Sequence, residues 1–370
     1  MIRLQRPLAE QYKQETEENL QIRIRRAREA LGKQVLILGH HYQRDEVIQW
    51  ADATGDSFGL SRFASNHQDS KYIVFCGVHF MAESADILTS ESQTVILPDL
   101  NAGCSMADMA DIDDVQGAWD ILAQTVDIEG VVPITYMNSS ADLKAFVGGN
   151  GGLVCTSSNA KAAVSWALSQ AGSSSDRARV LFFPDQHLGR NTAFQLGFGA
   201  SEMEVWDPNL ENGGLQERQM KDATFLLWKG HCSVHQRFSV AHVNDYRARV
   251  PGGKVIVHPE CAHEVVEVSD AVGSTDFIIN YISQQSPGTN VAIGTEIHLV
   301  NRLAKQNSHL SIESLDPLVC PCSTMFRIDS AHLCWVLENL LEGNVVNQIK
   351  VDNETKEWAK VALDRMLATC

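Results

Sequence analysis

Short apolar segments recur along the whole chain and are separated by polar or amphipathic stretches of similar length. Their length, their bounding glycine, proline and polar residues, and their lack of alternation are typical of strands buried on both faces. We predict such strands at residues 35–38, 71–75, 94–97, 131–136, 152–155, 180–184, 223–228, 255–257, 276–279 and 291–294.

Helices fill the intervals between these strands. Residues 8–31 have Leu20, Ile24, Ala27 and Leu31 on one helical face, and further helices are predicted around 81–88 and 160–171 and in the tail at 331–341 and 354–367. The glycine-rich stretch 148–152 predicts a loop. Strands that alternate with helices indicate an α/β fold with short parallel sheets covered on both faces.

Length and charge restrict the class of protein. A chain of 370 residues is long enough for two or three compact units. The net charge of −16, from 30 basic and 46 acidic residues, argues against a nucleic-acid partner. The charged N-terminal region lacks the apolar segment of a secretory signal, and no apolar run is long enough to span a membrane, so we expect a cytoplasmic protein.

Nine cysteines are present, and three of them differ from the rest by their setting. Cys104 and Cys232 closely follow a glycine, and Cys322 follows a proline, in backbone that can direct a thiolate into a site. Disulfides are not expected in a reducing compartment, and the spacing matches neither a zinc ribbon nor a ferredoxin. From spacing alone, buried apolar thiols, a reactive thiol and metal ligation all stay open.

Polar side chains gather where the predicted strands end. Histidine, carboxylate, tyrosine and amide groups in such positions suit proton transfer and hydrogen bonding to a ligand. They are His40, Tyr42, Tyr136, Asn138, His258 and Glu260. Each one, taken singly, is equally consistent with a structural hydrogen bond.

Small hydroxyl residues precede several predicted helices. Ser57, Ser157 and Thr275 are N-cap candidates, and a helix N-terminus also attracts carboxylate or phosphate. Three such places suit a substrate with several anionic groups. No Walker A motif and no GxGxxG is present, so nucleotide binding is not indicated.

Ten phrases of this sequence, in order, resemble the quinolinate synthase family. They are His40-His41-Tyr42-Gln43, Gly55-Asp56-Ser57, Ala102-Gly103-Cys104-Ser105-Met106-Ala107-Asp108, Tyr136-Met137-Asn138, Cys155-Thr156-Ser157-Ser158-Asn159-Ala160, Pro184-Asp185-Gln186-His187-Leu188-Gly189, Gly230-His231-Cys232-Ser233-Val234-His235, His258-Pro259-Glu260-Cys261, Gly273-Ser274-Thr275 and Cys322-Ser323-Thr324-Met325.

The resemblance implies three pseudo-equivalent three-layer α/β/α units around a central cavity that holds a [4Fe–4S] cluster. The implied units are residues 1–104 joined by the C-terminal helices of 323–370, residues 105–231, and residues 232–322. The implied cluster ligands are Cys104, Cys232 and Cys322, with Cys320 as a competitor for the third place. Three thiolates leave one iron open to act as a Lewis acid.

The resemblance also implies an activity and a substrate site. The family condenses iminoaspartate with dihydroxyacetone phosphate to give quinolinate, phosphate and water, and an L-aspartate oxidase or dehydrogenase supplies the first substrate. The implied catalytic residues are Tyr42, His258 and Glu260, and the implied substrate contacts are His40, Ser57, Tyr136, Asn138, Ser157, His258, Glu260 and Thr275.

Two other functions compete with this reading. A hydro-lyase of the aconitase type also uses an open iron, and an iron–sulfur sensor or carrier would use its thiols without catalysis. Turnover of the two substrates under strict anaerobiosis separates the first reading from both.

Overall fold

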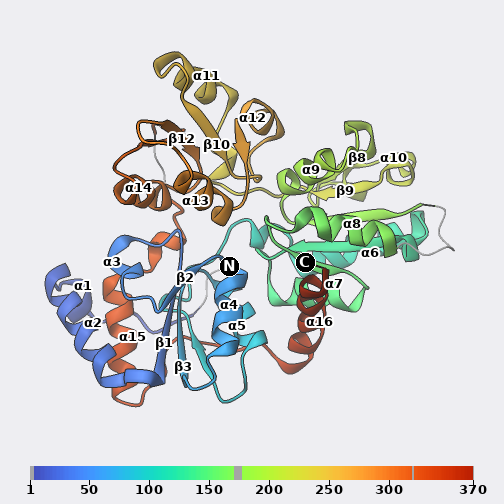
Figure 1. The fold of residues 1–370 in the computed structure, drawn as a ribbon. Helices are drawn as coiled ribbons and strands as arrows, with labels where there is room; N and C mark the ends of the chain where they lie inside the picture. The colour runs from blue at the N-terminus through green and yellow to red at the C-terminus, as the bar shows by residue number, and fades with distance from the viewer. Residues whose placement is uncertain (1–3, 171–176, 319–320, 370) are drawn as a thin grey trace. The chain divides into compact units, whose positions relative to one another are not determined.

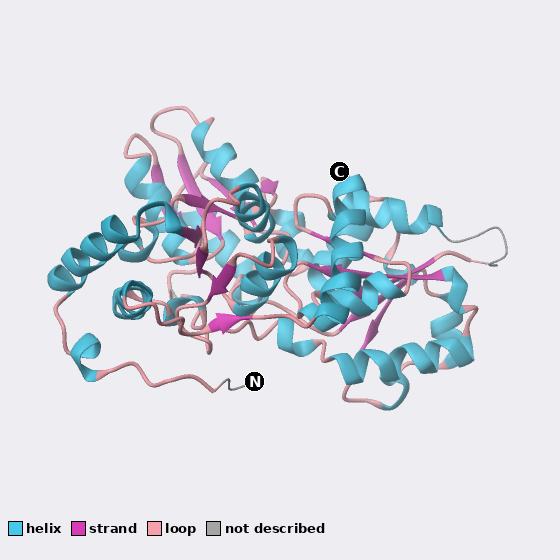
Figure 2. Cartoon of the chain, turned by 90° about the horizontal axis from the view of Figure 1, so that it is seen from below, coloured by secondary structure: helices cyan, strands magenta, loops and turns pink. Residues whose placement is uncertain are grey.

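The structure is a computed structural model, and it describes residues 4–170, 177–318 and 321–369. Three separate sheets, all parallel or nearly so, are each covered by helices, which confirms the predicted α/β fold (Figures 1 and 2). The chain divides into two compact units. One comprises Met1–Cys104, Glu296–Lys305 and Val319–Val351, and the other comprises Ser105–Thr295, Gln306–Leu318 and Asp352–Cys370.

The first sheet belongs to the first compact unit. Its strands are β1 (Val35–His40), β2 (Ala53–Gly55), β3 (Tyr72–Cys76), β4 (Thr94–Ile96) and β14 (Gln348–Ile349), and their order is β14-β4-β3-β1-β2. Only β14 runs antiparallel. Strands β1 and β3 are buried along their whole length, as expected of central parallel strands.

Helices enclose this sheet. Helices α2 (Glu17–Leu31) and α15 (Ser330–Leu341) pack against each other, and α4 (Ser57–Asn66) packs against α5 (His79–Leu88) (Figure 1). The predicted helix 8–31 is wrong as one element. It is split into α1 (Glu10–Lys13) and α2, because Thr16 accepts a hydrogen bond from the Asn19 amide and starts a new helix.

The second sheet has the order β6-β5-β7-β9-β8. Its strands are β5 (Val131–Tyr136), β6 (Leu153–Cys155), β7 (Arg179–Phe183), β8 (Met203–Trp206) and β9 (Phe225–Trp228), all parallel. Its helices are α6 (Ile112–Thr125), α7 (Ala141–Gly149), α8 (Ala160–Gln170), α9 (Gln186–Gln195), α10 (Glu217–Asp222) and the C-terminal α16 (Asn353–Thr369). The loop predicted at 148–152 is partly wrong, because Gly148 and Gly149 end α7.

The third sheet has the order β11-β10-β12-β13 and is wholly parallel. Its strands are β10 (Lys254–Val257), β11 (Ala271–Val272), β12 (Asn290–Gly294) and β13 (Ser311–Ser314). Helices α11 (Val240–Arg249), α12 (His263–Val268) and α13 (Thr275–Ser283) accompany it. Helix α14 (Ile297–Gln306) follows β12, and all but its last residue belong to the first compact unit.

The strand predicted at 276–279 is wrong, since these residues lie in α13. Ser274 caps the helix by accepting a hydrogen bond from the Phe277 amide, and Ile278 and Ile282 are buried one turn apart. A short apolar run has no period that distinguishes a buried strand from one face of a helix. Among the described residues, no helix is long and apolar enough to cross a membrane.

The three sheets share one topology. When β14 and β8 are left out and the remaining four parallel strands of each sheet are numbered in chain order, their spatial order is fourth, third, first, second: β4-β3-β1-β2, β9-β7-β5-β6 and β13-β12-β10-β11. Strand β14 extends the first sheet beyond its fourth strand, and β8 extends the second in the same place. Corresponding strands therefore place corresponding residues at the carboxyl end of each sheet, where ligands of parallel α/β proteins gather.

Candidate functional site

The predicted polar residues occupy equivalent positions in the three sheets. The first strand of each sheet ends in, or is followed by, a pair of polar residues separated by one residue: His40 and Tyr42, Tyr136 and Asn138, His258 and Glu260. The second strand is followed within three residues by Ser57, Ser157 and Thr275, respectively. A recurrence of this kind favours a shared role over nine unrelated structural hydrogen bonds.

Two of the histidines are fixed in the same way. The backbone N–H of Tyr42 donates to Nδ1 of His40 at 3.1 Å, and the backbone N–H of Glu260 donates to Nδ1 of His258 at 3.3 Å. In a neutral ring, this leaves the proton on Nε2. The Tyr42 ring also packs edge-on against His40, with 4.8 Å between ring centroids. Both imidazoles therefore present an Nε2–H donor on a rigid backbone.

Glu260 is the centre of a buried hydrogen-bond network. Its carboxylate lies 2.6 Å from Nδ1 of His235 and also accepts a hydrogen bond from Tyr136. Nε2 of His235 lies 3.1 Å from the hydroxyl of Thr295. With Nδ1 donating to Glu260, Nε2 accepts the Thr295 proton, which is the order of groups in a hydroxyl–imidazole–carboxylate triad.

Charges in this network are set by burial and by neighbours. Burial lowers the pKa of His258 to about 3, so its ring is neutral near pH 7. Burial opposes ionisation of Glu260, but His235 and His258, with the hydrogen bond from Tyr136, hold the pKa of Glu260 below its ordinary value. The His235 and His258 rings stack at 4.4 Å. The result is a carboxylate flanked by imidazoles, which can accept and return a proton.

The cysteines fall into two groups by exposure. Among the seven described, Cys76, Cys155, Cys261 and Cys334 are buried, whereas Cys104, Cys232 and Cys322 are partly exposed. Burial raises the pKa of Cys76 and of Cys334 to about 12, and it also raises the pKa of Cys155 and of Cys261 well above the ordinary value. The three accessible thiols are the three predicted ligands. Cys320 lies outside the described residues.

All three accessible cysteines begin the same local structure, which we call the cysteine loop: the cysteine and the seven residues after it. Each cysteine is followed by a two-residue turn and then a 3₁₀ turn, at Ala107–Met109, His235–Arg237 and Met325–Arg327. The seventh residue caps a helix through its side chain, as Asp111, Ser239 and Asp329 do for α6, α11 and α15.

Each cysteine loop comes after the fourth strand of its sheet, and two of the loops contact a buried carboxylate. The backbone N–H of Cys322 donates to Glu296 at 3.3 Å. The backbone N–H of Cys232 faces Asp185 and lowers its pKa, but burial and the nearby Glu260 raise the pKa of Asp185 well above its ordinary value. Oδ2 of Asp185 has no hydrogen-bond partner in the described part of the chain.

These observations fit a metal cluster held by thiolates. Accessible thiols in equivalent loops are the donors that iron–sulfur clusters use, and a buried carboxylate oxygen without a partner among the described residues lies near one of them. A single ion is a weaker fit. The thiol of Cys232 and ligand atoms of His235 and Glu260 lie within 4.8 Å of one another, but both ring nitrogens of His235 already make hydrogen bonds.

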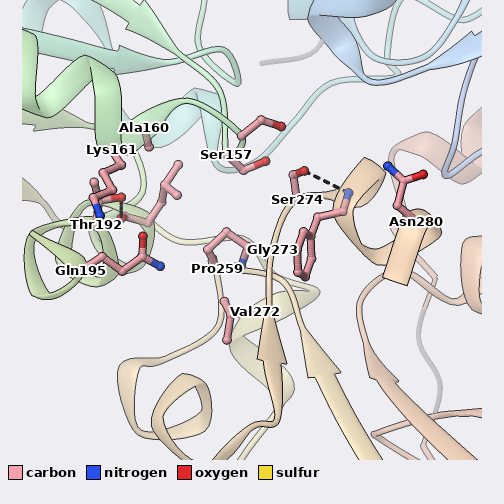
Figure 3. A pocket seen from close by; sticks show the side chains of 13 residues that line it. Ser157, Ala160, Lys161, Thr192, Gln195, Pro259, Val272, Gly273, Ser274 and Asn280 are labelled. Atoms are coloured by element: carbon pink, nitrogen blue, oxygen red, sulfur yellow. Dashed lines mark hydrogen bonds between the residues drawn. The ribbon is translucent and has the colours of Figure 1, made fainter. Parts of the chain in front are cut away.

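A cavity of about 460 Å³ opens between helices of the second and third sheets. Ser157, Gly273 and Ser274 line one part of it, and Lys161, Thr192 and Gln195 line another (Figure 3). The cavity therefore contains one predicted site residue, Ser157, and the residue that precedes another, Thr275. It has the groups to bind an anion: serine hydroxyls, one lysine and the starts of α8 and α13.

The structure brings some predicted residues into contact and leaves others apart. Tyr136, His258 and Glu260 meet in one network with Cys232, while Ser157 lines the cavity of Figure 3. His40 and Tyr42 contact each other in the first unit, where Cys104, Cys322 and Ser57 also belong. Asn138 is half-buried two residues beyond β5.

Two members of the network were not predicted. His235 stands three residues after Cys232, a Cys-x-x-His spacing that is a recognisable ligand or catalytic signal. Thr295 directly follows strand β12. Site residues were predicted after the neighbouring strands β10 and β11, but none was predicted after β12.

The sequence of this chain is similar to those of known proteins over nearly its whole length. The family model described as quinolinate synthetase A protein matches residues 22–368. A quinolinate synthase of Nocardioides is 58% identical over 347 residues, which is 94% of this chain and 88% of that protein. Those of Streptomyces coelicolor and Geobacillus thermodenitrificans are 56% and 53% identical, over 95% and 98% of this chain and 88% and 96% of theirs. The chain belongs to the quinolinate synthetase A protein family.

Proposed function

We propose that this chain is a transferase that condenses iminoaspartate with dihydroxyacetone phosphate to give quinolinate, phosphate and water, in the cytoplasm. The observation that carries the proposal is the equivalent placement of three accessible thiols, Cys104, Cys232 and Cys322, each in the same loop after the fourth strand of its sheet. Quinolinate is a precursor of the pyridine ring of NAD, which places the reaction in NAD biosynthesis.

The three thiolates would hold a [4Fe–4S] cluster. Three protein ligands leave one iron of such a cluster open, and when bound the cluster supplies Lewis-acid chemistry at that iron. A cluster used only to carry electrons has four thiolate ligands as a rule. The protein groups near Cys232 are those of a proton-transfer site, which suits catalysis better than sensing.

Glu260 and His258 would move protons during isomerisation and carbon–carbon bond formation. Glu260 is ionised and hydrogen-bonded to His235 and Tyr136, so it can take a proton from a carbon or nitrogen of the substrate. Neutral His258 can donate from Nε2. Tyr42, packed on His40, would supply a further hydroxyl. Thr295 would exchange protons with Glu260 through His235, which lies between them.

The hydroxyl residues would bind the carboxylates of iminoaspartate. Ser57 and Thr275 are the first residues of α4 and α13, and Ser157 precedes α8 by three residues. Amide N–H groups at these helix starts favour negative charge. His40 and Asn138 would add hydrogen bonds to the same substrate. An L-aspartate oxidase or dehydrogenase would supply the unstable iminoaspartate, as a functional partner.

The test is turnover under strict anaerobiosis. Chain reconstituted with iron and sulfide should form quinolinate from both substrates, and should form none when either substrate is left out. Glu260→Gln should keep its iron content and lose activity by a factor of about 10²–10⁴. Glu313→Gln, a change to an exposed carboxylate of the third sheet, is the matched control. A fully loaded chain that makes no quinolinate would refute the proposal, and full turnover by Glu260→Gln would refute the role of Glu260.

A further inference from the structure

The fifth residue after each accessible cysteine lies at the end of the 3₁₀ turn. These residues are Met109, Arg237 and Arg327. In all three loops the backbone N–H at this position donates to the carbonyl three residues earlier, at 3.1, 3.3 and 3.2 Å, respectively. The backbone is thus the same in each loop, and the fifth residue is held in a fixed direction relative to the cysteine.

Arg327 joins the loop of Cys322 to the segment that leads to Cys104. Its Nε donates to Oδ2 of Asp99 at 2.8 Å, and Asp99 stands five residues before Cys104. The Asp99 side chain is 1% exposed and that of Arg327 is 45% exposed. Oδ1 of Asp99 accepts from the Asn101 amide at 2.9 Å and from Gln5 at 2.7 Å, so this carboxylate has a single orientation.

Arg237 makes the corresponding contact from the loop of Cys232. It donates through Nε and Nη2 to Oδ2 of Asp316, at 3.2 and 3.1 Å, and Asp316 stands six residues before Cys322. Asp316 is 8% exposed on its side chain and Arg237 is 43% exposed. Arg237 also donates to the carbonyl of Leu318 at 2.9 Å. The arginine therefore holds two points of the segment that leads to the next cysteine.

The third loop uses its backbone instead of a charge. The carbonyl of Met109, the fifth residue after Cys104, accepts a hydrogen bond from the Trp228 indole at 2.6 Å, and Trp228 stands four residues before Cys232. Gly230 is required beside it, because a Cβ there would lie 2.2 Å from the carbonyl of Pro184. In each cysteine loop, therefore, the fifth residue after the cysteine makes a hydrogen bond or ion pair with the segment that precedes another of the three cysteines in the chain.

These ties are worth more than exposed ion pairs. In both ion pairs the carboxylate is almost wholly buried, so removal of the arginine leaves a charge in a place where water does not compensate it. Mutation of residues that orient metal ligands without binding the metal themselves commonly lowers metal affinity by a factor of about 10–100. Among the described residues, the side chains of both arginines contact carboxylates and a backbone carbonyl and not a thiol, so their effect on the thiols would pass through the loops.

We propose that Arg237 and Arg327 are positioning residues that hold the cysteine loops in place for cluster binding. The first ties the Cys232 loop to Asp316 and Leu318, which precede Cys322 in the chain, and the second ties the Cys322 loop to Asp99, which precedes Cys104. The proposal rests on the proposed function, because it takes the three thiols to be the ligands of one cluster. It predicts that loss of either arginine weakens the positioning of the cysteine thiols and has no direct effect on the residues that bind substrate.

The first experiment measures cluster retention in the full chain. Wild type, Arg327→Gln, Arg327→Lys and Asp99→Asn are reconstituted anaerobically, and the fading of the cluster's visible absorption is followed in air. Arg327→Gln and Asp99→Asn should lose the cluster about tenfold faster than wild type, with Arg327→Lys in between. Arg23→Gln, which breaks an ion pair between α2 and α15 in the same unit, is the matched control. Equal rates for Arg327→Gln and Arg23→Gln would overturn the proposal.

The second experiment does not need the cluster. In the apo-chain, a short bifunctional thiol reagent should link Cys104 to Cys322, and peptide mass spectrometry gives the yield. Arg327→Gln should lower that yield severalfold, whereas Arg23→Gln should not. A yield that is unaffected by Arg327→Gln, or no link in wild type, would overturn the proposal. If wild type binds no cluster at all, the proposed function fails, and the cross-link still decides whether Arg327 holds the two thiols.

Discussion

Single atoms decide how the histidines of this site can act. Nδ1 of His40 and of His258 accepts a hydrogen bond from a backbone N–H two residues later, so Nε2 is the nitrogen that would exchange a proton with a ligand. The sequence predicted both residues as site members, but the choice of nitrogen depends on backbone geometry at the strand end. The same geometry orients Tyr42 and Glu260, whose own amides make these hydrogen bonds.

Replacing His258 by asparagine tests this atom-level assignment. The Asn side-chain oxygen can take the place of Nδ1 and accept the Glu260 amide, but nothing then stands at Nε2. We expect His258→Asn to keep the iron content and the thermal stability near wild type and to lower kcat by a factor of about 10²–10⁴. His258→Gln, which can place a polar atom near Nε2 without a proton to exchange, should be equally inactive. Turnover close to wild type in either variant would contradict the role in proton transfer.

Accessibility separates the candidate ligands from the other thiols. We expect Cys104→Ser, Cys232→Ser and Cys322→Ser each to retain less than half of the iron of wild type, because a cluster with two thiolate ligands is poorly held. Cys76→Ala, a change to a buried thiol of the first unit, should retain all of it. Iron and sulfide counted per chain give the answer. Full iron in Cys322→Ser would point to Cys320 as the third ligand.

At the scale of helices and strands, the periodicity of apolar residues predicted where elements occur better than it predicted their first and last residues. The split of the N-terminal helix at Thr16 and the helix α13 in place of a strand both depend on caps, Thr16 and Ser274, whose side chains bond to amides three residues on. A local pattern of apolar residues does not carry that information. The glycines that end α7 were interpreted as a loop, yet one of them is needed for packing.

Gly148 allows helix α16 to lie against α7. A Cβ at this position would be 2.0 Å from the backbone carbonyl of Trp358, whereas at Gly149 the nearest atoms are 3.8 Å away. We expect Gly148→Ala to lower the free energy of unfolding by about 3 kcal/mol through overpacking. Gly149→Ala should leave it equal or slightly higher, since alanine favours helix over glycine. Equal denaturation midpoints for the two variants would show that α16 adjusts freely.

An ion pair between α2 and α15 gives a pH-dependent contribution to stability. Arg23 donates to both oxygens of Glu338, at 2.9 and 2.6 Å, and Tyr12 donates at 2.7 Å, so the pKa of Glu338 is held below its ordinary value despite partial burial. A carboxyl with a lowered pKa stabilises the fold above its unfolded pKa, and that stability is lost as the pH falls through the folded pKa.

Glu338→Gln should therefore reduce stability at neutral pH and flatten the loss of stability below pH 4.5. Chemical denaturation between pH 3 and pH 7 measures both effects. Glu217→Gln removes a carboxylate of an exposed pair and serves as the control with little effect. A parallel decline of wild type and Glu338→Gln with acid would contradict the assignment.

At the scale of the molecule, the sequence predicted the fold class from the rhythm of strands and helices. It did not show that the strand order repeats three times, because strand order depends on contacts between distant residues. Spacing alone also gave no metal site, since 128 and 90 residues separate the three cysteines. The family resemblance supplied that information. The boundaries of three pseudo-equivalent units and the central cavity stay predictions.

The three proposed cluster ligands are divided between the compact units, since Cys104 and Cys322 belong to one and Cys232 to the other. A ligand that binds only the native state stabilises it. We expect anaerobic calorimetry of the loaded chain to show one unfolding transition, and removal of iron by a chelator to lower its midpoint and separate it into two. One unchanged transition after complete iron loss would indicate that the units are coupled without the cluster.

The threefold recurrence of strand order has a consequence for selectivity. If one small substrate meets the strand ends of all three sheets, as the family resemblance implies, it is offered three similar ways to bind, of which one leads to product. The side-chain pairs at the first strand ends break this degeneracy, since they are histidine with tyrosine, tyrosine with asparagine, and histidine with glutamate. The chemical identity of three pairs, rather than the shape of the scaffold, would then dictate which end of the substrate faces which group.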